Sequence, residues 1–187
     1  MARRFLDDIR ADIQTEFANN TVGAITAADV RNVLTDIIDS TVQDEGFLYT
    51  QTTSAAIPLT GTFQNIDPWT EELGGDGEFV IPNLSSGNIA TGAHGGWSYD
   101  LAFELRVTAA NNEVFEFTLG RNGVPYGYIA SLEGNGADER SVSGSMPIIA
   151  SVSTEVITLM ARAVDGAGNL VIEGGLLGVT VLPTNNP

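Results

Sequence analysis

The sequence contains no cysteine and no lysine, and it has a single histidine. Without cysteine the chain can form no disulfide, no thiol nucleophile and no cysteine-ligated zinc site. The eight basic residues are all arginine and stand against 24 acidic residues, so the formal net charge is −16. A surface this acidic repels nucleic acid and anionic lipid, and we expect neither nucleic acid nor membrane as a partner.

The sequence also lacks a long hydrophobic run. No stretch approaches the roughly 20 apolar residues of a membrane-spanning helix. Residues 1–8 carry two arginines with no apolar run behind them, so we expect no secretory signal and predict synthesis in the cytoplasm. With 43% hydrophobic residues among 187, the chain is long enough for one good core and a smaller appendage.

The appendage is predicted at the N-terminus, where residues 2–18 and 26–42 repeat apolar side chains with a helical rhythm. Thr26 is a suitable N-cap for the second helix, and Asp29 follows three residues later in a capping-box arrangement. The apolar stripes include Phe5, Ile9, Ile13, Phe17, Val30, Val33, Leu34, Ile37 and Ile38. Short helices are marginal in water on their own, so residues 1–49 are predicted as a helical hairpin that anchors or oligomerises the chain.

Beyond a boundary near residue 50 the pattern changes from helix to strand. Residues 47–59 are expected to be an extended junction, and residues 50–187 a β domain. Between Trp97 and Thr108 apolar and polar residues alternate strictly, which indicates one buried and one wet face. The sequence therefore predicts a mainly β protein with an N-terminal α region: a helical hairpin followed by an antiparallel jelly-roll β-sandwich.

About eight strands are expected in this β domain. They are predicted at 63–66, 78–82, 97–108, 114–119, 126–132, 142–152, 155–164, and in the pair 170–173 and 176–182. Residues 67–71 are expected to form one helical turn, residues 134–140 a polar loop, and Asn122-Gly123 a tight hairpin turn.

The strands at 155–164 and 176–182 carry apolar residues on both faces. In a lone antiparallel sandwich one face of each strand should be wet. We therefore expect neighbouring subunits to cover the outer face of these strands, and the alternative is that the N-terminal helices cover it.

Candidate chemistry is sparse. His94 is flanked by glycines, which indicates a surface loop rather than a positioned base, and no known hydrolase or nucleotide-binding motif occurs. We expect no enzyme activity, no cofactor and no metal, although a carboxylate pair that meets only in space stays open, as does a calcium ion at residues 165–169. Trp69, Tyr126 and Tyr128 are candidates for a ligand face that stacks on a sugar.

Two stretches resemble known families. Residues 23–40, GAITAADVRNVLTDIIDS, resemble a segment near the N-termini of tailed-bacteriophage fibre, head-fibre and decoration proteins. Residues 154–163 and 176–182 resemble the last strands of trimeric TNF- or C1q-like jelly rolls. The resemblance implies a homotrimeric structural protein of the virion, with its helices against the major capsid protein or another virion component and its β domain outward.

The resemblance carries over no catalytic residue. Because the helical region is short, it favours a compact capsid decoration or head-fibre protein over a long tail fibre. The alternative function is a receptor- or glycan-binding tail-fibre module, in which a host glycan contacts the ligand face of Trp69, Tyr126 or Tyr128.

Overall fold

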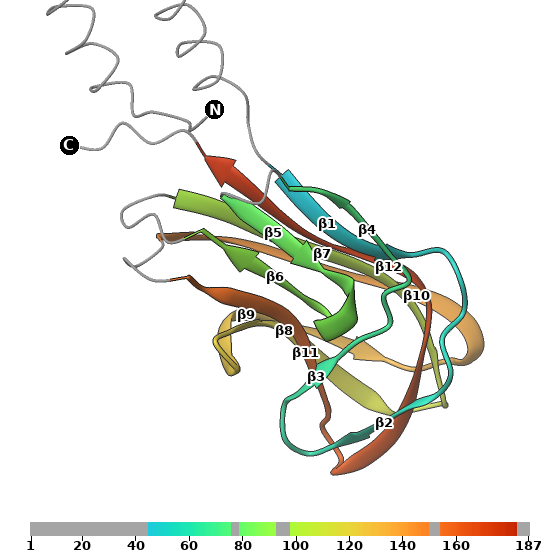
Figure 1. The fold of residues 1–187 in the computed structure, drawn as a ribbon. Helices are drawn as coiled ribbons and strands as arrows, with labels where there is room; N and C mark the ends of the chain where they lie inside the picture. The colour runs from blue at the N-terminus through green and yellow to red at the C-terminus, as the bar shows by residue number, and fades with distance from the viewer. Residues whose placement is uncertain (1–44, 76–78, 93–97, 150–153, 183–187) are drawn as a thin grey trace, which may run out of the picture. The chain divides into compact units, whose positions relative to one another are not determined.

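The computed structural model describes residues 45–75, 79–92, 98–149 and 154–182, which form twelve strands and one short 3-10 helix (Figure 1). The elements are β1 (Glu45–Thr50), β2 (Ile57–Thr60), β3 (Gln64–Ile66), β4 (Glu71–Gly74), β5 (Val80–Asn83), η1 (Leu84–Ser86), β6 (Asn88–Thr91), β7 (Ser98–Ala109), β8 (Val114–Arg121), β9 (Val124–Glu133), β10 (Gly136–Ile149), β11 (Val156–Ala163) and β12 (Ala167–Leu182).

The predicted helices, and with them all nine stripe residues from Phe5 to Ile38, lie outside the described residues. His94 and Trp97 lie outside them as well. Within the described segments, no helix has the length and apolar character needed to span a bilayer.

The strands form two sheets of six strands, packed as a sandwich. Sheet A has the order β10-β7-β12-β1-β4, and β2 pairs with one end of β12. Sheet B has the order β5-β6-β11-β8-β9, and β3 pairs with β11. The two-layer antiparallel sandwich agrees with the predicted fold class for the described part of the chain.

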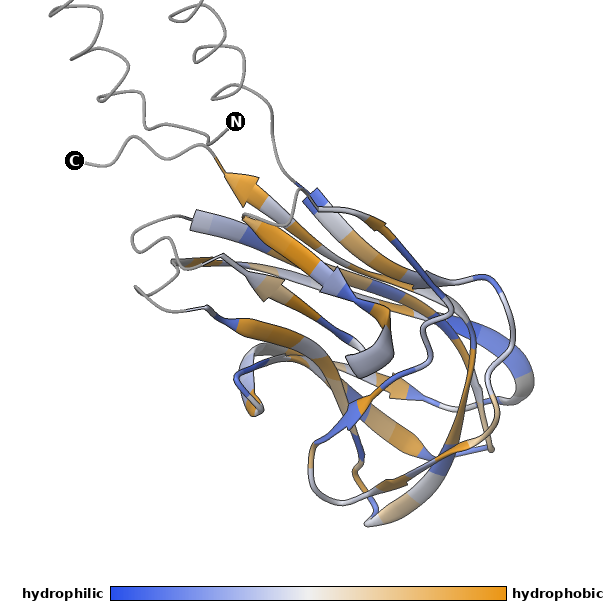
Figure 2. Cartoon of the chain, viewed as in Figure 1, coloured by the Kyte–Doolittle hydropathy of each residue, from blue (hydrophilic) through white to orange (hydrophobic). Residues whose placement is uncertain are grey.

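The core lies between the two sheets and follows the alternation seen in the sequence. On β7 every second side chain from Tyr99 to Val107 is at most 2% exposed, whereas Asp100, Glu104 and Arg106 face solvent. Sheet B contributes the buried side chains Phe115, Phe117, Leu119, Ile157 and Leu159 to the core. Figure 2 shows this alternation of apolar and polar residues along the strands. Each large side chain buried here contributes roughly 1.5–3 kcal/mol to folding.

The Asn122-Gly123 hairpin is confirmed. Both residues have positive φ, 53° and 79°, and the flanking Arg121 and Val124 are paired across the ladder. Two positive φ angles in a two-residue loop define a type I′ turn, which matches the twist of the joined strands.

Several details differ from the sequence-based expectation, and β6 was not predicted at all. The segment expected as a junction contains β1 and β2, and β4 begins at Glu71, where a helical turn was expected to end. Strand β10 already begins at Gly136, inside the expected polar loop. The two predicted strands at 170–173 and 176–182 are one strand, β12.

Two physical causes account for the differences at β4, β10 and β12. All four residues of β4 are exposed, and β10 lies at the edge of sheet A, so backbone pairing rather than a buried side-chain pattern defines both strands. In β12 the buried positions are Leu170 and Ile172, then Leu177, Val179 and Val181, so the inward face changes parity near Gly174-Gly175. The glycine pair therefore marks an irregularity within one strand instead of a turn.

Candidate functional surface

The outward face of sheet A, which has no third layer among the described residues, carries a cluster of apolar side chains. We call it the apolar patch and define it as Phe47 and Tyr49 of β1, Leu73 of β4, and Leu176 and Gly178 of β12. These residues are adjacent in register: Phe47 lies opposite Leu73 on one side and Gly178 on the other, and Tyr49 lies opposite Leu176. The patch is therefore continuous across three neighbouring strands.

Much of the patch faces solvent. Leu73 is 61% exposed and Leu176 is 36% exposed, while Phe47 and Tyr49 are half-buried. Gly178 lets the ring of Phe47 lie against the sheet, because a Cβ atom at this position would come within 2.8 Å of Cε1 of Phe47. The glycine thus allows an aromatic ring to cover the backbone of β12.

One edge of the patch is fixed by a hydrogen bond. The hydroxyl of Tyr49 donates to Oε2 of Glu71 at 2.6 Å, linking β1 to β4. This bond to the carboxylate raises the pKa of Tyr49 above its ordinary value of 10.0, with smaller contributions from burial and from the charge of Glu71. The tyrosine is therefore a neutral, oriented part of the patch at physiological pH.

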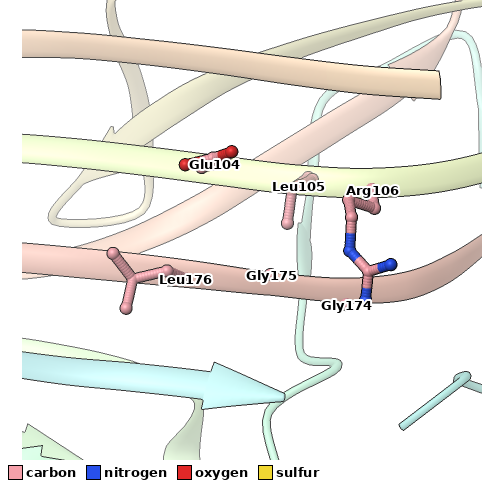
Figure 3. Close-up of a pocket in the computed structure, with 6 residues that line it drawn as sticks. All are labelled: Glu104, Leu105, Arg106, Gly174, Gly175 and Leu176. Carbon is pink, nitrogen blue, oxygen red and sulfur yellow. The ribbon is translucent and has the colours of Figure 1, made fainter. Parts of the chain in front are cut away.

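Beside the patch lies a hollow of about 110 Å³ between β7 and β12. It is lined by Glu104, Leu105, Arg106, Gly174, Gly175 and Leu176 (Figure 3). Figure 3 shows Arg106 extending from β7 towards Gly174 of β12. Its Nη2 donates to the carbonyl of Glu173 at 3.4 Å, and its Nη1 pairs with Glu139. The hollow thus has an apolar lining from Leu105 and Leu176, and a charged rim.

A continuous apolar surface with a charged rim is typical of a protein–protein contact. In the described segments no three His, Cys, Asp or Glu side chains come together as metal ligands. What this arrangement can do is bury apolar area against another polypeptide.

Apart from the apolar patch, a cluster of polar side chains lies at the end of sheet B. Glu155 is 2% exposed and forms an ion pair with Arg121, whose Nη2 lies 2.8 Å from Oε1. The Nε of Arg121 donates to Oε2 at 3.1 Å, and Asn122 Nδ2 donates to the same oxygen. The pKa of Arg121 is raised chiefly by its hydrogen bond to Glu155. The cluster ties the β8–β9 hairpin to the start of β11, and its role is structural.

The proposed ligand-face residues come from two separate parts of the fold. Trp69 lies in the connection between β3 and β4 and is 7% exposed, so little of its ring is open to a ligand. Tyr126 belongs to β9 in sheet B, is half-buried, and has the guanidinium of Arg121 5.2 Å from its ring centre. Tyr128 is also in β9, and its side chain lies outside the described part. The sugar-stacking role stays a prediction.

Sequence reasoning identified only part of the apolar patch. Leu176 belongs to the strand whose two apolar faces predicted an external contact. Phe47, Tyr49 and Leu73 were missed because they lie in segments read as a junction or as following a helical turn. The signal that was available is the alternation Phe47, Tyr49 against the buried Leu48 and Thr50.

Strand β11, the other strand with apolar residues on both faces, differs from β12 in how well its outward side chains are covered. Met160 of β11 lies on the outward face of sheet B but is only 4% exposed. Its Cγ and Sδ atoms pack over the backbone of Gly120. Val164, just after the strand, is 46% exposed. Cover by a neighbouring subunit is therefore needed less at β11 than at β12.

The comparisons with known proteins agree with this architecture. No protein-family model matches the sequence, and no curated protein matches it. Among solved structures, the chain is similar to the Eiger TNF of S. frugiperda, with a TM-score of 0.52, 10% identity and coverage of 75% of this chain and 92% of that one. It is also similar to the globular domain of zebrafish complement 1qA, with a TM-score of 0.53, 11% identity and coverage of 77% and 100%. The fold is thus a TNF/C1q-like jelly roll.

Proposed function

We propose that this chain is a homotrimeric structural protein of a bacteriophage virion, a capsid decoration or head-fibre protein. The residues before β1 anchor it to the major capsid protein or another virion component, and the jelly roll projects outward. Support for the virion comes from the resemblance of residues 23–40 to fibre and decoration proteins. Support for self-association comes from the jelly roll and from the apolar patch.

The apolar patch carries the proposal. A single sandwich would leave Leu73 61% and Leu176 36% exposed on a face with no covering layer among the described residues. Burial of each leucine contributes up to roughly 1.5–3 kcal/mol, and three copies of the patch bury it threefold in a closed trimer. The hollow beside Leu176 offers room for a side chain of a neighbouring subunit.

The test is the mass of the full-length protein in solution, measured by size-exclusion chromatography with light scattering. Wild type is expected to be a trimer. Leu73→Asp places a charge in the contact, and the expected result is a monomer or a concentration-dependent mixture. Val124→Asp is the matched control, because Val124 is an equally exposed apolar residue, 63%, in the β9 end of sheet B.

Two outcomes would count against this assembly. One is a monomeric wild type, and the other is a Leu73→Asp trimer that is as stable as the wild type. The location in the virion needs a separate test: antibody raised against the β domain should label the heads of intact particles. Labelling at the tail tip would favour the second candidate below.

The second candidate is a receptor- or glycan-binding module. It is supported by the aromatic Tyr126 near exposed apolar residues of β9, Val124 at 63% and Ile129 at 42%. Aromatic rings of this kind stack on sugars and anchor protein contacts. A glycan array probed with wild type and Tyr126→Ala decides it: specific binding that the substitution abolishes supports a receptor function.

A further inference from the structure

A polar cavity of about 380 Å³ lies at the opposite edge of sheet A from β4, where β9 and β10 meet the β7–β8 turn. Its polar lining residues are Asn112, Ser131, Glu133, Asn135, Arg140 and Ser141. This volume is within the range of about 300–1,000 Å³ that holds small ligands. The cavity does not overlap the apolar patch, and it lies at the other end of β9 from Tyr126.

Main-chain hydrogen bonds hold the loops that form the cavity. The amide of Asn112 donates to the carbonyl of Gly134 at 3.2 Å, and the amide of Gly134 donates to the carbonyl of Glu113 at 2.8 Å. The side-chain amide of Asn135 donates to Asp138 at 2.8 Å. Because both loops are tied to each other, the backbone that carries these polar groups is arranged before any ligand arrives.

Arg140 is placed by an irregularity in β10. Gly136 pairs with Ala109 and Arg140 with Val107, so four residues of β10 advance against two of β7. Such bulges redirect side chains at sheet edges and beside binding sites. Arg140, the first residue of the regular β10–β7 ladder after the bulge, lines the cavity.

Arg140 is also the one arginine in the described segments that forms no ion pair. Arg106, Arg121 and Arg162 are paired with Glu139, Glu155 and Glu116. In a chain of net charge −16, a guanidinium kept out of all ion pairs is available to an external anion. The remaining lining of amides, hydroxyls and one carboxylate is suited to the hydroxyl groups of a sugar.

We propose that this cavity binds an acidic sugar residue, a saccharide unit with a single carboxylate, which Arg140 recognises. Glu133 favours a sugar over a bare inorganic anion, because its oxygens accept hydrogen bonds from the sugar hydroxyls, which an inorganic anion lacks. The charge of the whole chain argues against a polyanion. A glycan that is neutral apart from one uronic or sialic acid satisfies both conditions.

The test is an NMR titration of the 15N-labelled full-length protein. The probes are the methyl glycosides of glucuronic, galacturonic and N-acetylneuraminic acid, each compared with its own methyl ester, which lacks the charge. At least one acid is expected to shift the amide signals of Gly134 and Asn135, and its ester is expected to bind at least about tenfold more weakly.

Two variants localise the binding. Arg140→Gln removes the charge and is expected to weaken binding by about tenfold to a hundredfold without changing the melting temperature, since no ion pair is lost. Arg162→Gln makes the same charge change on sheet B and is expected to leave the affinity unchanged.

Any of four results overturns the proposal: no acidic sugar binds, ester and acid bind equally, Arg140→Gln has no effect, or inorganic phosphate alone binds in an Arg140-dependent way. The cavity is formed by one chain, so the proposal does not depend on the trimer. Light scattering on the same samples records the oligomeric state and separates the two questions.

Discussion

The carboxylate of Glu155 is 2% exposed, and each of its oxygens receives a donor from Arg121. Its backbone amide donates in turn to Oγ1 of Thr91 at 3.0 Å. A buried charge is tolerated only when such partners replace the lost water. At the scale of single residues, this group therefore fastens the turn end of the β8–β9 hairpin to the start of β11, in addition to the β8–β11 ladder.

We expect Glu155→Gln to lower the free energy of unfolding by about 2–3 kcal/mol, because an amide nitrogen then faces donors and the charge of Arg121 loses its partner. Urea unfolding at fixed protein concentration measures this. The control is Glu139→Gln, since the Glu139–Arg106 pair is 44% and 50% exposed and should contribute about 1 kcal/mol or less. Equal losses for the two variants would contradict a special role for burial.

Glu173 provides a pH-dependent link at the same scale. Its carboxylate accepts hydrogen bonds from Thr53 at 2.7 Å and from Thr108 at 2.8 Å, and these bonds lower its pKa below the ordinary 4.5. A lowered acid pKa stabilises the fold above the unfolded pKa, and this contribution is lost as the pH falls below about 4.5 towards the folded pKa.

Glu173→Gln is therefore expected to be less stable than wild type at pH 7, with the difference shrinking as the pH falls through 4.5. Thermal unfolding measured from pH 7 to pH 3 follows this convergence. A gap between the two melting temperatures that stays constant over this range would show that the carboxylate charge is not what stabilises the link.

At the scale of elements, the glycine pair of β12 gives a sharp comparison. A Cβ atom at Gly175 would lie 2.5 Å from Cδ2 of Leu105 and 2.9 Å from the backbone oxygen of Glu104. A Cβ atom at Gly174 would meet only the far end of the half-exposed Arg106 side chain, at 2.5 Å from Nη2. The fold therefore leaves no room for a side chain at position 175, whereas position 174 can accept one if Arg106 shifts.

Gly175→Ala should cost about 1–3 kcal/mol of stability through overpacking, and Gly174→Ala should change it by no more than about 0.5 kcal/mol. Chemical denaturation of the two variants side by side is the measurement. Similar values for both would mean that β12 adjusts its path at the hollow.

Strands were predictable where one face is buried. The alternation of residues 97–108 predicts β7 because only one face of the strand, which includes Leu101, Phe103 and Leu105, has to be removed from water. The same logic does not apply to β4, whose residues are all exposed, nor to the first residues of β10. Those two strands form by pairing with strands that are distant in the sequence, and a local residue pattern carries no information about such pairing.

The candidate surface was predictable to the same degree. Leu176 was identified because an outward leucine in a strand with a full inward face needs a partner. Tyr49 and Leu73 could not be assigned to the patch from the sequence, because only the pairing of β1 with β4 and β12 makes them neighbours of Leu176. The sequence does not single out Arg140, since whether an arginine forms an ion pair depends on which residues the tertiary structure places beside it.

At the scale of the whole molecule, charge opposes the proposed assembly. Each chain carries −16, so three chains in contact repel one another, and salt screens this repulsion over about 8 Å at 0.15 M. We expect the trimer to dissociate more readily at 20 mM NaCl than at 300 mM NaCl. Sedimentation velocity at several protein concentrations measures the shift. Tighter association at low salt would instead indicate that ion pairs dominate the interface.

The central position of β12 in sheet A has a consequence for biosynthesis. β1 and β7 both pair with β12 and are neighbours only through it, yet β12 follows every other described strand along the chain (Figure 1). While the nascent polypeptide leaves the ribosome, each of these strands therefore has one unpaired edge. Such edges can pair with other unfinished chains, so the interval before β12 is synthesised is when the new chain is most exposed to aggregation.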